Sequence, residues 1–189
     1  MNNDAARLSS ELAKRMNYRL HAKQLNIPIL NDFVVQEDGN PQTVLLATGS
    51  GFIEQLTSDG FVEEGDFEKR INLVIDNTKQ FMRMNGCENV DNSFMKLREY
   101  SNGIFNFSIY VQDMVLPIPG QKRVLRSFVA FFYEPRMKDF YQFTLSIGPI
   151  ALPAEHLKVW KIDLIDDQVT IGLDSMLKTL LDNLSYKDK

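Results

Sequence analysis

The feature that most constrains the fold is a change of hydrophobic period, from helical spacing to alternation, over residues 94–147. In the clearest segment the apolar members are Phe105, Phe107, Ile109 and Val111, and the polar members are Asn106, Ser108, Tyr110 and Gln112. Alternation places successive side chains on opposite faces of a strand. The segment is therefore predicted to be a half-buried β-strand.

Two more strands are predicted in the same region. Residues 124–133 are apolar at both parities, which is typical of a central strand covered on both sides. Residues 141–147 alternate again, with Tyr141 and Phe143 among the apolar members. The link over residues 134–139 is short enough for an antiparallel hairpin.

The remaining extended segments are shorter. Residues 33–35 and 44–47 flank Asp38-Gly39-Asn40-Pro41, a composition that predicts a hairpin turn. A short helix is expected over residues 52–56, followed by a turn at Asp59-Gly60. Residues 157–165 are expected to add one strand, with Trp160, Ile162 and Leu164 on one face.

Three helices are predicted from periodicity. The first carries an apolar stripe and can be capped by Asp4; the second begins at Asp66 and ends at Gly86; the third is leucine-rich. The first stripe is Leu8, Leu12, Met16 and Leu20, and the third is Leu173, Met176, Leu177, Leu180, Leu181 and Leu184. Stripes of this kind must pack on another element, and the sheet is the expected partner.

These elements predict one α+β domain over residues 1–189, with a mainly antiparallel sheet of five or six strands. Residues 1–24 form a basic N-terminal helix, residues 25–148 the sheet plus a central helix, and residues 149–189 a loop, a strand and a C-terminal helix. This element order resembles the Mog1/PsbP-like sandwich, and it is also similar to that of small acidic secretion chaperones. The resemblance is one of topology, so it implies a fold and no functional residues.

Charge narrows the range of partners. The net charge is −4, and residues 1–24 hold five cations and two anions, which leaves −7 on the remainder. An acidic body argues against nucleic acid as the main partner, because phosphate binding needs clustered Lys and Arg. Cys87 is the sole cysteine, no signal-peptide core precedes the domain, and no apolar run is long enough to span a bilayer. A cytoplasmic protein is expected.

Few residues favour metal or histidine chemistry. The two histidines are His21 and His156, too few for a His/Cys zinc site, and no G-x-S-x-G nucleophile motif is present. His156 beside Glu155 is a weak candidate for a general base, and a surface histidine is the simpler interpretation. Asp163, Asp166 and Asp167 could hold Mg²⁺ or Ca²⁺, although acidic residues before a helix are more simply explained by the helix dipole.

Two other local features are candidate sites. Gly49-Ser50-Gly51 resembles a weak anion-binding loop if a helix follows it, whereas a flexible turn is the alternative. Cys87 follows a predicted helix C-terminus, where the dipole disfavours a thiolate. We therefore predict no catalytic residue, no metal and no cofactor. The basic N-terminal helix could touch a membrane surface, RNA or an acidic partner, and a cover helix with a solvated outer side is the alternative.

The strongest candidate for a binding surface is an aromatic and charged set on one sheet face and its hairpin. Its members are Tyr110, Gln112, Arg126, Tyr133, Glu134, Arg136 and Tyr141. Tyr and Arg are enriched at binding hot spots, so the set favours a non-enzymatic binding or accessory protein, such as a chaperone, an adaptor or an immunity-type protein. The alternative interpretation is that a helix covers this face of the sheet. A small enzyme that uses carboxylates, Tyr and Arg, and an assembly subunit that forms a homodimer through a sheet edge, are the alternative functions.

Overall fold

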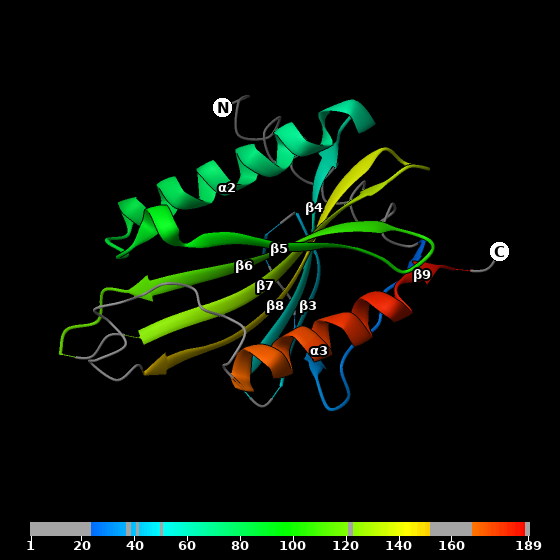
Figure 1. The fold of residues 1–189 in the computed structure, drawn as a ribbon. Coiled ribbons are helices and arrows are strands. Elements are labelled where there is room, and N and C mark those ends of the chain that lie inside the picture. Colours follow the sequence, from blue (N-terminus) through cyan, green and yellow to red (C-terminus); the bar gives the residue numbers. More distant parts are fainter. Residues whose placement is uncertain are drawn as a thin grey trace, which may run out of the picture.

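The central element of the computed structural model is a seven-stranded antiparallel sheet with the strand order β2-β3-β4-β8-β7-β6-β5 (Figure 1). The structure describes residues 24–36, 39–40, 42–49, 51–120, 123–151 and 168–187. The strands are β2 (Val34–Val35), β3 (Thr43–Gly49), β4 (Phe52–Phe61), β5 (Phe94–Ser101), β6 (Asn106–Leu116), β7 (Arg123–Glu134) and β8 (Asp139–Ala151). A second sheet pairs β1 (Leu25–Asn26) with β9 (Ser185–Tyr186). The helices are α2 (Phe67–Met84) and α3 (Gln168–Asn183), and two 3₁₀ turns, η1 (Glu64–Asp66) and η2 (Val90–Asn92), precede α2 and β5.

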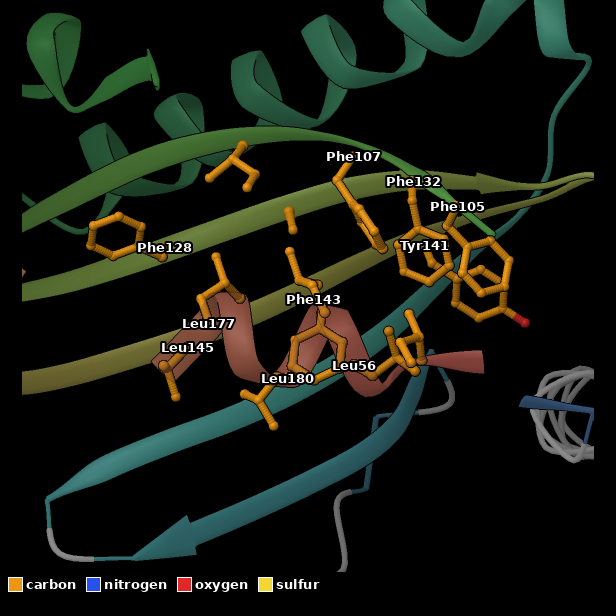
Figure 2. Close-up of a cluster of buried hydrophobic side chains, with 14 of the residues drawn as sticks. Leu56, Phe105, Phe107, Phe128, Phe132, Tyr141, Phe143, Leu145, Leu177 and Leu180 are labelled. Carbon is orange, nitrogen blue, oxygen red and sulfur yellow. The ribbon is translucent and has the colours of Figure 1, made fainter. Parts of the chain in front are cut away.

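The two helices lie on opposite faces of the sheet, as Figure 1 shows. We name these faces the α2 face and the α3 face. The α3 face carries the larger core, in which Leu177 and Leu180 of α3 lie against aromatic side chains of β6, β7 and β8 (Figure 2). The α2 face carries a smaller core in which Ile71 and Ile75 of α2 pack with residues such as Phe131. Burial on both faces explains why the central strand β7 is apolar at both parities.

Strand register builds an aromatic ladder across the α3 face. Phe107 of β6 pairs with Phe132 of β7, which pairs with Tyr141 of β8. Their ring centroids lie 5.3 Å and 5.2 Å apart, within the range of favourable aromatic contacts. The two strands predicted from this alternation are thus confirmed as β6 and β8, each with one face in this core. The predicted half-burial of β6 is wrong, because Ser108 and Tyr110 on its other face are buried as well.

Residues 52–56 do not form the predicted helix. They belong to β4, which pairs with β3 on one side and with β8 on the other. The predicted turn at Asp59-Gly60 is instead an irregularity within this strand, where the pairing with β8 shifts and Gly60 has a φ of 85°. Glycine adopts this left-handed conformation without steric cost, so the strand continues to Phe61.

The central helix is confirmed, and its end follows the expected chemistry. Gly86 has a φ of 70°, and the N–H of Cys87 bonds the carbonyl of Met82 at 2.9 Å. Asp66 precedes the helix but makes no capping bond; its Oδ1 pairs with Nζ of Lys69 at 2.6 Å.

Element counts differ from the prediction in two respects. The described residues contain two α-helices, whereas three were predicted. The predicted N-terminal helix lies outside the residues that the structure describes. The strand predicted over residues 157–165 also lies outside it. The main sheet has seven strands, whereas five or six were predicted, because it includes β4, where a helix was expected, and β5, which was not predicted as a separate strand. No helix within the described ranges has both the length and the hydropathy needed to cross a bilayer.

Candidate functional site

The predicted binding set is divided between the two faces of the sheet. Gln112 pairs with Ser127, and Asp113 pairs with Arg126. Directly paired residues share a face and neighbours in a strand do not, so Arg126 lies on the α3 face while Gln112 lies on the α2 face. The same parity places Tyr110 and Tyr133 on the α2 face. It places Glu134 and Tyr141 on the α3 face. Arg136 lies in the exposed turn between β7 and β8. The single surface inferred from sequence is therefore corrected to two.

The tyrosines of this set on the strands contribute mainly to the cores. Tyr141 is buried and stacks on Phe132, and its hydroxyl lies 3.4 Å from Asp139. Tyr110 is buried under α2, and its ring lies 5.6 Å from that of Phe131 in an edge-to-face arrangement. Burial raises the pKa of both tyrosines above the ordinary value, so both hydroxyls stay protonated. These two positions offer no exposed aromatic sheet surface.

Glu134 and Arg136 fasten the C-terminal strand β9 to the β7–β8 hairpin. The buried carboxylate of Glu134 accepts the Tyr186 hydroxyl at 2.5 Å and the N–H groups of Arg136 and Met137 at 2.8 Å and 2.7 Å. The guanidinium of Arg136 lies 3.4 Å above the Tyr186 ring. Burial, reinforced by the bond to Glu134, raises the pKa of Tyr186. Their contacts give both residues a structural role here.

A pocket of about 280 Å³ lies between α2 and the sheet. Its helix side is formed by Arg70, Leu73, Val74, Asn77 and Thr78. Its sheet side is formed mainly by Gln42, Thr57, Asp59 and Gln142. These residues come from segments far apart in the sequence, and none of them belongs to the predicted set.

The polar centre of the pocket is an ion pair. Nη1 of Arg70 lies 3.0 Å from Oδ2 of Asp59, and Nε2 of Gln42 donates to the other oxygen of Asp59 at 3.3 Å. Both charged side chains are about one-third exposed, so they can still meet a polar group of a ligand. Among the described residues that line the pocket, Asp59 is the only carboxylate, which is too few for a Mg²⁺ or Ca²⁺ site.

An exposed apolar stripe extends the pocket along α2. Leu73, Phe81 and Met84 are 50%, 58% and 78% exposed. Positions eight and eleven residues apart return to the same side of a helix, so the three side chains form one flank. The opposite side of α2 is buried through Ile71, Ile75 and Met82. We call the pocket together with Phe81 and Met84 the α2 groove.

Sequence periodicity missed this groove because α2 is apolar on two sides. Helical spacing predicted this helix, and the structure assigns Met82 to the core and Phe81 to the surface. A second set of apolar residues at Leu73, Phe81 and Met84 is the signal that was available. Only the packing of α2 shows which set is free.

The other chemical candidates form no catalytic constellation in the described part of the chain. Gly49 is the last residue of β3 and Gly51 directly precedes β4, so no helix N-terminus follows to bind an anion. Burial raises the pKa of the Cys87 thiol, which disfavours the reactive thiolate. No group of three or more His, Cys, Asp or Glu that could hold a metal occurs among the described residues, and His21, His156 and Asp163, Asp166 and Asp167 lie outside them.

Comparison with known proteins supplies no family for this site. No protein-family model and no curated protein matches the chain. The function is therefore inferred from the groove and its chemistry.

Proposed function

We propose that the chain is a non-enzymatic binding or accessory protein whose protein partner docks in the α2 groove. The observation that carries this proposal is the row of Leu73, Phe81 and Met84 on the flank of α2, beside a pocket with an ion pair. Single exposed apolar residues are ordinary, but three of them on one flank of a helix, next to a concave site, are typical of an interaction surface. The chaperone, adaptor and immunity-type alternatives all agree with such a site.

The chemistry of the groove favours a protein segment as its occupant. Leu73 and Met84 are eleven residues apart, so the row extends about 16 Å along the helix axis. An occupant of that length can place apolar side chains along Leu73, Phe81 and Met84 and a polar group at Arg70 and Asp59. Most polar groups of the pocket already have partners within the chain, such as the Thr78 hydroxyl on the Val74 carbonyl at 2.8 Å. A small polar ligand would find fewer free groups.

The proposal moves the binding surface from the sheet to the helix that covers it. The rings of Tyr110 and Tyr141 are buried, whereas Phe81 is exposed. Phe81 is also flanked by Met84, whose flexible side chain adapts to different apolar partners. Recognition through an aromatic anchor is retained, with a different residue in that role.

Replacing Leu73 and Phe81 together with Glu should strongly weaken binding. Loss of two apolar anchors at the centre of an interface costs about 2 kcal/mol or more, which is a decrease in affinity of about thirtyfold or more. The measurement is affinity purification of the tagged chain at native expression, with the recovered partner quantified for wild type and for L73E/F81E. Both side chains are exposed, so the unfolding temperature should remain close to that of wild type.

The matched control is Ile171→Glu, since Ile171 is 55% exposed on α3 at the other side of the sheet. Partner recovery should be unchanged in this variant. Full recovery with L73E/F81E, or equal loss with Ile171→Glu, would contradict the proposal. A bound small molecule instead of a protein would point to the pocket alone and would likewise contradict it.

A further inference from the structure

Glu54 is a carboxylic acid in the interior of the sheet on its α3 face. It is the third residue of β4, and its side chain is completely buried. The residues opposite it are Ala47 of β3 and Leu145 of β8, and both are buried and apolar. An ionised carboxylate at such a position has lost its hydration shell, which is costly without full compensation.

The contacts of Glu54 compensate only one of its two oxygens. Oε2 accepts the backbone N–H of Leu30 at 3.1 Å. Oε1 has no hydrogen-bond partner among the described residues. A buried carboxylate ordinarily needs donors on both oxygens, so this environment suits the neutral acid better than the anion.

The single donor belongs to a segment that lies over the edge of the sheet. We call residues 27–33, between β1 and β2, the strap. Ile27 and Leu30 of the strap pack against the α3-face core. The Phe33 ring covers Gly49, where an added Cβ would lie 2.6 Å from a ring carbon. The strap is therefore held by a few apolar contacts and by the bond from Leu30 to Glu54.

No described charged group is placed to stabilise the Glu54 anion. The positions opposite it on β3 and β8 are apolar. On α3, Asp174 pairs with Arg98, and Lys178 pairs with Asp182, which also bonds Tyr100. Arg126 of β7 is paired with Asp113. On β4 itself, Asp59 is paired with Arg70. Asp32 of the strap is exposed.

Burial raises the pKa of Glu54 to about 7, and the bond from Leu30 opposes this increase in part. A carboxyl that titrates near 7 when buried and near its ordinary value of 4.5 in water takes up a proton when it becomes buried. The buried state is therefore most favoured below pH 4.5. The contribution of this proton to the stability of the buried state decreases as the pH rises toward 7, and above about 7 it is lost.

We propose that Glu54 acts as a pH-operated latch for the strap. As the neutral acid, Glu54 keeps residues 27–33 closed over β4. As the anion, it favours an open strap, because water can then reach both carboxylate oxygens. Opening uncovers the apolar residues beneath the strap while the rest of the sheet stays paired.

The test is native-state hydrogen exchange at the Leu30 amide, corrected for the intrinsic exchange rate at each pH. The opening constant should rise about tenfold between pH 6 and pH 8. This factor follows from the pKa values of the buried and the free carboxyl. In Glu54→Gln, which cannot ionise, it should stay constant. Glu63→Gln removes an exposed carboxylate that pairs with Lys138, and this control should keep the tenfold rise.

Three results would overturn the latch. They are a pH-independent opening constant in the wild type, an equal rise in Glu54→Gln, or an opening constant at the Leu30 amide that equals that of the Phe131 amide in β7, which would indicate exchange through global unfolding. If Glu54→Gln does not fold, a carbon-13 titration of the Glu54 carboxyl in the wild type decides. An apparent pKa near 7 supports the latch, and one near the ordinary value of 4.5 overturns it.

Discussion

Phe132→Ala is expected to lower the free energy of unfolding by about 3–5 kcal/mol, which is typical for loss of a buried phenylalanine. Phe132 is completely buried on β7, at the centre of the aromatic ladder. Its ring centroid lies 5.3 Å from those of Phe105 and Phe107 and 5.2 Å from that of Tyr141. Alanine removes all three contacts and leaves a cavity between paired strands, where the backbone cannot easily collapse.

Urea denaturation followed by circular dichroism measures this change. Phe81→Ala removes the same side chain from an exposed position of α2 and should change stability by no more than about 0.5 kcal/mol. Both variants lose the same ring, so the difference between their changes in stability reports the contribution of burial. A loss below about 1 kcal/mol for Phe132→Ala would mean that the aromatic ladder is not packed as described.

Asp113→Ala is expected to cost about 3–5 kcal/mol, since it leaves a buried cation without its carboxylate. The side chains of Asp113 and Arg126 are 1% and 11% exposed. Arg126 binds both oxygens of Asp113, with Nε–Oδ1 at 2.9 Å and Nη2–Oδ2 at 3.2 Å. A two-point bond of this type is stronger and more directional than a single contact.

The exposed pair of Arg83 and Asp91 is the matched control. Its side chains are 55% and 86% exposed, so Asp91→Ala should cost less than about 1 kcal/mol. The cost of Asp113→Ala should also persist at 1 M salt, because buried pairs are screened far less than exposed ones. Equal costs for the two variants, or a cost for Asp113→Ala that disappears in salt, would contradict a buried pair.

The sequence predicted strands well but not which residues share a face. Alternation within residues 105–112 assigned parity in β6 correctly, and apolarity at both parities identified β7 as central. Alternation contains no information on register between strands, and a shift of one residue exchanges the faces. For this reason Arg126 was grouped with Gln112, although its partner across the strands is Asp113.

Strand β4 was missed because its local signals are those of turns and short helices. Gly49-Ser50-Gly51 and Asp59-Gly60 bracket the segment, and Glu54 in its centre is atypical of a buried strand position. Pairing with β3 and β8, the latter far away in the sequence, overrides these local preferences. Neither the burial of Glu54 nor its bond to Leu30 has a sequence signature.

The α2 groove could be predicted only in part. The amphipathic pattern located the helix and its inner stripe, but the helix also carries Leu73, Phe81 and Met84 on its flank. Which apolar stripe is free depends on how α2 lies across β6, β7 and β8. The ion pair of Arg70 with Asp59 depends further on the irregularity at Gly60 in β4.

Site-specific photo-crosslinking tests the central claim, that the partner docks along α2. The photoreactive residue p-benzoylphenylalanine is introduced in place of Phe81, where its ring extends from an exposed position, and in parallel in place of Ile171 on α3. Irradiation of cells that express these variants should yield one adduct of defined mass from position 81 and none from position 171. Adducts from position 171 with none from position 81 would contradict the claim.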